Sequence, residues 1–170
     1  TSGYLRYGTD PGAMNTVVYD DRGSGTVDDT HYVTVQGLVS STTYSFVLVS
    51  GGQTFYASGT TPYAISTAPE LPFGQIACPS DTAFGYVKKL SGSAAPGTII
   101  SITIQHAGNT SSPMSGISAD PSGVWSVDIG NARTANLAQC FTYSPSGGDT
   151  LLIFAHGGSD GTATATVDTG

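Results

Sequence analysis

The sequence predicts an all-β protein built from two tandem β-sandwiches, of which the first is incomplete. Three observations support this fold class. The 170 residues suit two domains of ordinary size better than one small sandwich. Apolar and polar residues alternate over short stretches, as in half-buried strands, and only residues 131–139 are compatible with a short helix. The 23 glycines, with abundant serine and threonine, favour turns and strands.

A proline-containing connector at residues 69–73 divides the chain into a first domain, residues 1–68, and a second domain, residues 74–170. Alternating segments bounded by glycine or proline turns predict the strands of both domains. In the first domain these segments are 3–8, 16–19, 31–36, 44–49, 54–56 and 63–66. In the second domain they are 84–90, 98–105, 124–129, 151–156 and 162–167.

The chain carries little charge, and most of that charge is negative. Charged residues make up 10% of the sequence, and the formal net charge is -7. Nucleic acid is therefore excluded as a partner, because phosphate binding needs clustered lysine and arginine. No apolar run reaches the roughly 18 residues of a membrane span, so none is expected. The sequence does not begin with methionine, and we interpret it as a processed mature protein or as part of a longer one.

The two cysteines, Cys78 and Cys140, lie far apart, with no cysteine or histidine beside either at the spacing of a zinc site. We expect a disulfide between them, because the uncharged, turn-rich composition is typical of proteins outside the cell. Two buried, reduced thiols remain the alternative. The sequence thus predicts an extracellular or cell-surface location and no cofactor.

Residues 37–46 read Gly-Leu-Val-Ser-Ser-Thr-Thr-Tyr-Ser-Phe and resemble the fibronectin type III signature. The resemblance implies that Tyr44 is the corner tyrosine, whose hydroxyl bonds back to the backbone and fixes the crossover between two sheets. Residues 4–12 likewise resemble strand C of that family and its turn. Since two strands, A and B, precede strand C in the family, the resemblance also implies that the first domain lacks them.

The second domain resembles the immunoglobulin-like, or carboxypeptidase-regulatory-like, repeats of large bacterial and archaeal surface proteins. The similar segments are residues 95–98, 119–127 and 149–153, each a turn followed by a strand. The resemblance implies a second immunoglobulin-like sandwich.

A sandwich without two strands leaves apolar faces and unpaired backbone groups in water. We therefore expect another copy of the chain, or a part of this one outside the given sequence, to add a strand to the first domain, as in donor-strand assemblies. Addition from another copy, head to tail, would generate a filament. A fragment of a longer chain is the simpler alternative. The predicted function is a non-enzymatic structural subunit of an extracellular assembly, and the alternative is a glycan- or ligand-binding accessory domain of a secreted enzyme.

Other motifs are weaker. Residues 157–161 match the G-x-S-x-G pattern of hydrolases beside His156, but a strand rather than a helix is expected to follow them. We expect His31, His106 and His156 to lie singly on strand surfaces. Asn109 begins a glycosylation sequon in an expected loop, and glycans are possible partners.

An acidic cluster surrounds a glycine-rich loop, at Asp20, Asp21, Asp28 and Asp29. Carboxylates in an irregular loop are typical calcium ligands, but no EF-hand spacing is present, and we favour a solvated loop whose charge discourages aggregation. Several tyrosines would form a carbohydrate platform if they shared one exposed face, although alternation places most of them at core-facing or cross-strand positions. These tyrosines are Tyr4, Tyr7, Tyr19, Tyr32, Tyr56 and Tyr63.

Overall fold

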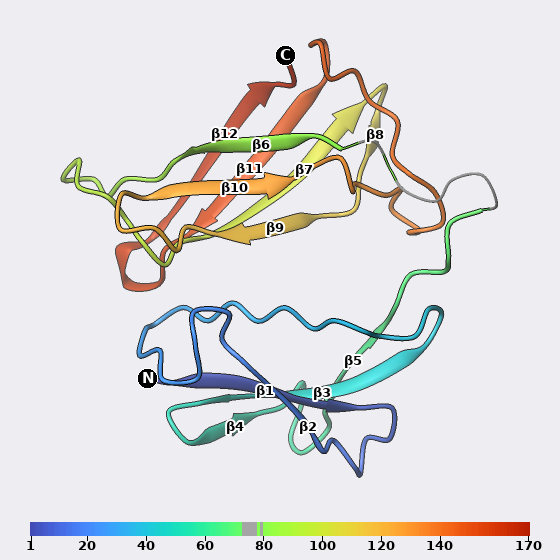
Figure 1. Cartoon of the computed structure of the whole chain (residues 1–170), viewed down its shortest axis with the longest axis vertical. Coiled ribbons are helices and arrows are strands. Elements are labelled where there is room, and N and C mark those ends of the chain that lie inside the picture. Colours follow the sequence, from blue (N-terminus) through green and yellow to red (C-terminus); the bar gives the residue numbers. More distant parts are fainter. Residues whose placement is uncertain (73–77, 79) are drawn as a thin grey trace. The chain divides into compact units, whose positions relative to one another are not determined.

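The computed structural model describes residues 1–72, 78 and 80–170 and confirms the all-β fold (Figure 1). Every strand pairing is antiparallel, and the described residues contain no α-helix. The chain forms two compact units, Thr1–Glu70 and Leu71–Gly170, which divide within the predicted connector. Residue 73 of that connector, and residues 74–77 and 79 of the predicted second domain, lie outside the described residues.

The first unit contains one five-stranded sheet, with strand order β2-β1-β3-β4 and β5 paired to the other end of β3. Gly51 and Gly52, both at positive φ, join β3 and β4 in the two-residue turn that such dihedrals favour. The strands are β1 (Gly3–Gly8), β2 (Thr16–Tyr19), β3 (Thr43–Ser50), β4 (Gln53–Phe55) and β5 (Tyr63–Ser66).

Between β2 and β3 the chain is irregular and runs along one side of this sheet, as the blue-to-cyan segment of Figure 1 shows. The strand predicted at residues 31–36 is therefore wrong, because no described strand pairs with this segment. Its side chains still approach the sheet closely. A Cβ atom built on Gly3 would lie 2.5 Å from the His31 ring, so only glycine fits at that contact.

Strand alternation divides the side chains of β3 between the two faces of the first sheet. Val47 and Val49 are buried on one face. Tyr44, Phe46 and Leu48 lie on the other face, toward the irregular segment, and Phe46 stacks on Tyr63 across the ladder with ring centroids 5.2 Å apart.

The second unit contains two antiparallel sheets. The larger sheet has the order β12-β11-β7-β8, with β9 also paired to β7, and the smaller sheet is β10-β6. In Figure 1 the smaller sheet crosses in front of the larger one. The strands are β6 (Thr82–Tyr86), β7 (Ile99–His106), β8 (Asn109–Thr110), β9 (Met114–Ile117), β10 (Val124–Asp128), β11 (Thr150–His156) and β12 (Thr162–Asp168).

Alternating residues of β7 and β10 fill the core of the second unit. Ile100, Ile102 and Ile104 face Trp125 and Val127, as the alternation predicts. Residues 131–139 form turns and isolated bridges, so the short helix considered there is wrong. These turns carry Cys140 to Cys78, and the predicted disulfide is present with a Cα–Cα distance of 5.5 Å.

Candidate functional site

A buried carboxylate organises the irregular segment of the first unit. The Asp20 side chain is only 1% exposed. Arg22 donates to it through its backbone N–H, Nε and Nη2, each at 2.9 Å. The Nδ1 atom of His31 lies 3.1 Å from Oδ2, and the N–H of Tyr32 donates to the same oxygen at 3.2 Å. The Arg22 side chain is the main reason that the pKa of Asp20 lies well below its ordinary value.

Arg22 also joins Asp20 to the far end of the loop. Its Nη1 donates to Asp28 at 2.7 Å, and its Nη2 donates to the carbonyl of Thr30. The guanidinium thus occupies the centre of the acidic cluster that sequence reasoning considered for calcium. No group of three or more potential metal ligands occurs among the described residues. The expectation of a solvated loop is wrong for Asp20, which is buried and ion-paired.

The acidic residues bind one edge of the segment from residue 31 to residue 36. The N–H of Asp21 donates to the carbonyl of Tyr32 at 2.9 Å, and the N–H of Thr34 donates to Asp21 Oδ1 at 2.8 Å. Val33 and Val35 alternate with these residues, and nothing in the described part of the chain hydrogen-bonds to their backbone groups. This two-residue alternation leaves a row of free donors and acceptors like that of a sheet edge.

An apolar groove of about 400 Å³ lies beside this edge. His31, Tyr32 and Val33 form one side, and the sheet contributes Leu5, Leu48 and Phe55, among other residues. Leu48 remains 41% exposed and Phe55 45% exposed. The groove therefore combines apolar surface with unpaired backbone groups, which are the two features that an added β-strand would cover.

The Tyr44 hydroxyl accepts a hydrogen bond from the N–H of Val39 at 3.1 Å. It thus bonds back to the backbone five residues upstream, in the manner of a corner tyrosine. The bond connects the start of β3 to the end of the irregular segment.

Two of the three histidines have carboxylate partners, contrary to the expectation of single surface histidines. His31 contacts Asp20, and Nδ1 of His106 lies 2.8 Å from both oxygens of Asp149. The backbone N–H of Ser144 also donates to Asp149 and is the first cause of its lowered pKa. These contacts link strands and loops.

The other ring nitrogen of His31, Nε2, lies 3.5 Å from the Ser50 hydroxyl, so His31 joins the Asp20 carboxylate to a serine on β3 at the limit of hydrogen-bond distance. The Ser50 hydroxyl also lies 2.7 Å from the hydroxyl of Thr1.

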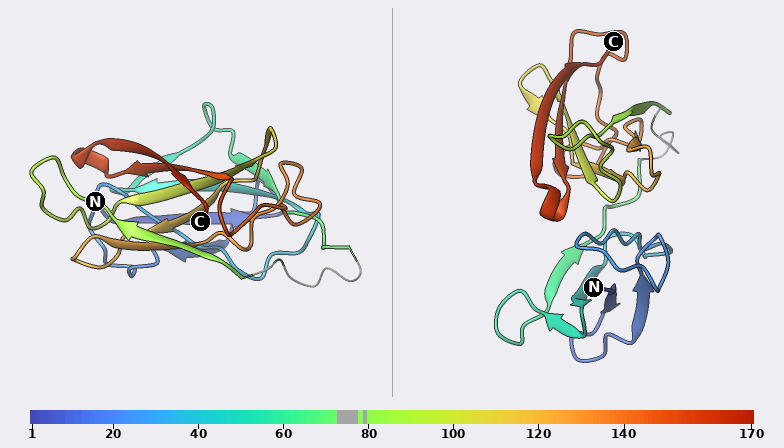
Figure 2. Two further views of the ribbon diagram at one scale, coloured as in Figure 1. Left: turned by 90° about the horizontal axis from the view of Figure 1, so that it is seen from above. Right: turned by 90° about the vertical axis from the view of Figure 1, so that its left-hand side faces the viewer.

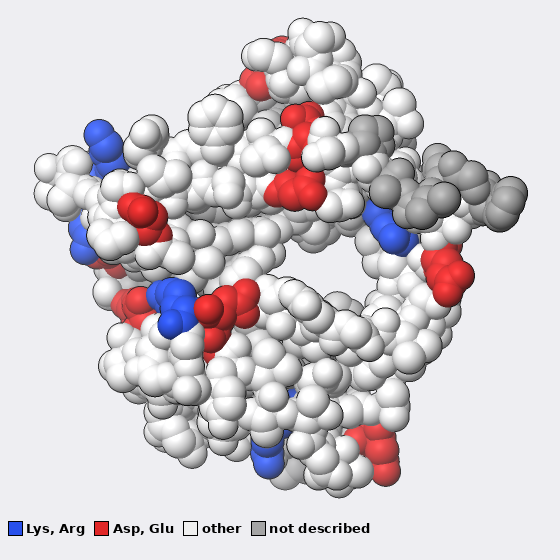
Figure 3. Space-filling view, in the orientation of Figure 1, with Lys and Arg blue, Asp and Glu red and all other residues white. Residues whose placement is uncertain are grey.

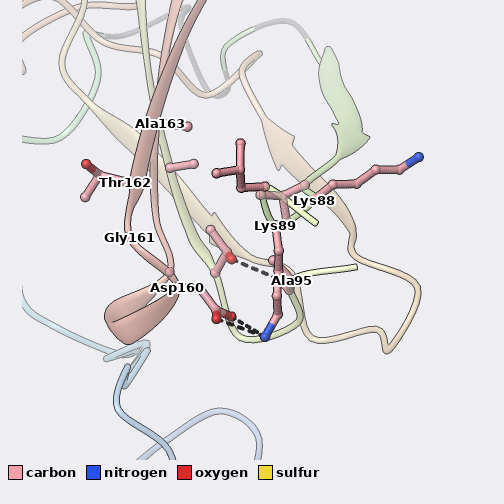
Figure 4. Close-up of a pocket in the computed structure, with 12 residues that line it drawn as sticks. Lys88, Lys89, Ala95, Asp160, Gly161, Thr162 and Ala163 are labelled. Atoms are coloured by element: carbon pink, nitrogen blue, oxygen red, sulfur yellow. Dashed lines mark hydrogen bonds and ion pairs between the residues drawn. The ribbon is translucent and has the colours of Figure 1, made fainter. Parts of the chain in front are cut away.

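The G-x-S-x-G segment forms a 3-10 turn, Gly158–Asp160, and β12 follows it where a nucleophile elbow needs a helix. His156 accepts a hydrogen bond from the backbone N–H of Gly158 at 3.3 Å. Asp160 binds Lys89 at 2.8 Å beside a shallow pocket of about 370 Å³ (Figure 4). Figure 4 shows Lys88 directed away from that ion pair.

Asn109 lies on the short exposed strand β8 rather than in the expected loop, and its side chain is open to solvent. The tyrosines considered for a carbohydrate platform do not share one face, because they divide between the two faces of the first sheet. Tyr4 pairs with Tyr19 on one face, whereas Tyr7 meets Tyr44 on the other.

Sequence reasoning missed two exposed aromatic residues in the second unit. Phe84 and Tyr86 are 78% and 71% exposed on the outer face of β6. The signal was present in the alternation of β6, where Ala83 and Gly85 take the inward positions. Figure 3 shows that charged atoms cover little of the visible surface, which consists mainly of uncharged residues.

These features define an all-β, disulfide-bonded protein of two compact units, with an irregular segment in the first unit whose unpaired backbone groups lie beside an apolar groove. No helix in the described part of the chain is long and apolar enough to cross a membrane. Comparison with family models, with curated proteins and with solved structures gave no match. The resemblances to fibronectin type III and immunoglobulin-like domains therefore remain predictions.

Proposed function

We propose that this chain is a non-enzymatic structural module of an extracellular or cell-surface assembly, and that its first unit accepts a β-strand from another copy. The observation that carries the proposal is the free backbone edge at Val33 and Val35, where Val33 lines the groove that Leu48 and Phe55 also line. An added strand would satisfy the backbone groups of the edge and cover the half-exposed side chains.

The Asp20 network supports this role because it fixes the edge before a partner arrives. Arg22, His31 and Tyr32 all bind the same carboxylate, so the segment is already ordered. Pre-ordering reduces the conformational entropy lost on association. The contact is heterologous, so it adds copies head to tail without closing. The disulfide Cys78–Cys140 supports an oxidising location outside the cell.

The test places a positive charge on the groove floor. Phe55→Lys should prevent a strand from packing there, whereas the free unit should tolerate lysine because Phe55 is already 45% exposed. Val27→Lys is the matched control at an exposed apolar position outside the groove. Sedimentation velocity over a concentration series should show Phe55-dependent self-association, and negative-stain microscopy should show filaments. A wild-type chain that stays at 17.2 kDa at every concentration would contradict the proposal.

A glycan-binding accessory domain is the second candidate, and the exposed pair Phe84 and Tyr86 favours it. Aromatic rings on the same face of a rigid strand provide flat apolar surface on which sugar rings can stack. Titration with soluble polysaccharides should then give binding that Phe84→Ala and Tyr86→Ala abolish. Binding that survives both substitutions would remove this candidate.

A further inference from the structure

Strand β12 forms an unprotected edge in the second unit. It is the longest edge strand that the structure describes, and all seven of its residues are exposed. Figure 1 and the right-hand view of Figure 2 show this red strand at the margin of its sheet. Its described strand partner is β11, so its other side pairs with no described strand.

The hydrogen bonds at the two ends of the hairpin determine which backbone groups are free. The N–H of Gly157 donates to Gly161 at one end, and the N–H of Thr169 donates to Asp149 at the other. In an antiparallel ladder the bonded residues alternate, so the odd-numbered residues of β12 bond to β11. The backbone groups of Thr162, Thr164, Thr166 and Asp168 therefore point away from the sheet.

This edge lacks the features with which proteins usually prevent edge pairing. The register between β11 and β12 runs without a bulge from Thr162 to Asp168. The strand reads Thr-Ala-Thr-Ala-Thr-Val-Asp, with no proline and no lysine, and its one charge stands at the end. An edge of this kind is a ready template for another strand.

The side-chain pattern of β12 is self-complementary, so that two copies of the strand can pair with each other. Antiparallel pairing about a two-fold axis at Ala165, the middle of the strand, places Thr164 opposite Thr166 of the second copy. Ala163 then faces Val167 of the second copy, so threonines meet on one face and small apolar residues on the other. Cross-strand threonine pairs are favourable, and about eight backbone hydrogen bonds would form.

We propose that β12 is a homodimer interface, at which two copies pair antiparallel and join their five-stranded sheets into one. The partner is a second copy rather than another protein, because the strand matches its own reverse on both faces and brings no like charges into the middle of the contact. The interface is isologous and closes as a dimer. It is separate from strand addition at the first unit, and together the two contacts would join head-to-tail chains in pairs.

The test uses Phe55→Lys chains, in which the proposed head-to-tail contact is blocked, so that dimers report on β12 alone. This variant should sediment as a dimer of the 17.2 kDa chain. Adding Thr164→Lys and Thr166→Lys places like charges opposite each other and should weaken dimerisation by about tenfold or more. The corresponding double glutamate variant should do the same, and an equimolar mixture of the lysine and glutamate chains should form heterodimers.

The control changes Asn109 and Thr110 to lysine on β8, at the other edge of the same sheet, and should leave the dimer intact. Trp125 fluorescence verifies that the second unit of each variant is folded, and near-ultraviolet tyrosine circular dichroism verifies the first unit, which contains Phe55 and most of the tyrosines. A Phe55→Lys chain that stays monomeric, lysine chains that dimerise like their parent, or a mixture that fails to associate would each overturn the proposal. If strand addition at the first unit is wrong but β12 pairing is right, the result is different: wild-type chains would form β12 dimers and no larger assembly.

Discussion

Replacing Asp20 by asparagine should destabilise the first unit and leave the second unit unchanged. The Asp20 carboxylate is almost fully buried and accepts hydrogen bonds from Arg22 and Tyr32 as well as contacting His31. Breaking a buried ion pair by removing one partner costs about 3–5 kcal/mol. The lower end applies here, because Arg22 keeps its contact with Asp28. With a urea dependence of about 1–3 kcal/mol per molar, a loss of about 3 kcal/mol lowers the unfolding midpoint by about 1–3 M.

The unfolding of each unit can be followed with a different spectroscopic probe. Trp125, the only tryptophan, lies in the second unit, whereas every tyrosine except Tyr86 and Tyr143 lies in the first. Urea unfolding followed by near-ultraviolet tyrosine circular dichroism should therefore shift in Asp20→Asn, while Trp125 fluorescence should not. The neighbouring Asp21→Asn is the control, because Asp21 is exposed and an amide oxygen can still accept from Thr34.

The pH dependence provides an independent check of the same carboxylate. Because the pKa of folded Asp20 lies below the ordinary value of 3.8, its stabilising effect is present above about pH 4 and is lost as the pH falls toward the folded pKa. The wild-type first unit should lose stability across this acid range more steeply than Asp20→Asn. Equal slopes, or a tyrosine midpoint that Asp20→Asn leaves unchanged, would refute the assignment of Asp20 as the centre of the network.

Three further predictions concern packing and cross-links. Reducing the disulfide should lower the stability reported by Trp125 by about 4 kcal/mol, the chain-entropy value for a separation of 62 residues; an unchanged midpoint would contradict it. Gly85→Ala should cost about 1–3 kcal/mol, because the new Cβ would lie 2.8 Å from the Trp125 ring, whereas Gly25→Ala, with open space around it, should be nearly neutral in urea unfolding. Tyr44→Phe should cost about 1 kcal/mol by tyrosine circular dichroism through loss of the Val39 bond, and equal stability would refute that role.

The fold class and most strands could be predicted because alternation is a local property. The isoleucines of β7 and the Trp125 strand show it clearly, and both lie in the core as predicted. Residues 31–36 show the same alternation but form no strand, because strand assignment also requires a partner and the sequence of one segment does not reveal it. The backbone contact of the Tyr44 hydroxyl was expected only from the resemblance of residues 37–46 to the fibronectin type III signature.

The Asp20 network could not be predicted in the same way. Asp20, Arg22, His31 and Tyr32 become neighbours only when the loop folds back on itself, and the sequence shows merely acidic residues near glycines. A count of charged residues does not show which of them form ion pairs. The acidic cluster was therefore interpreted as a solvated loop. The exposed pair Phe84 and Tyr86 was missed because aromatic residues in strands are more often placed in the core.

The arrangement of charge bears on whether the edge at Val33 and Val35 is protected or available. Proteins often block an edge with exposed charges that repel an incoming strand. The acids beside this edge do not act in that way, because the carboxylates of Asp20 and Asp28 are both bound by Arg22. Asp21 bonds to Thr34 on the opposite side of the segment, so it satisfies that side and leaves the free edge open. The acids thus hold the edge in place through Arg22 and Thr34, and they do so from the side opposite the free backbone groups, which leaves those groups open to an added strand.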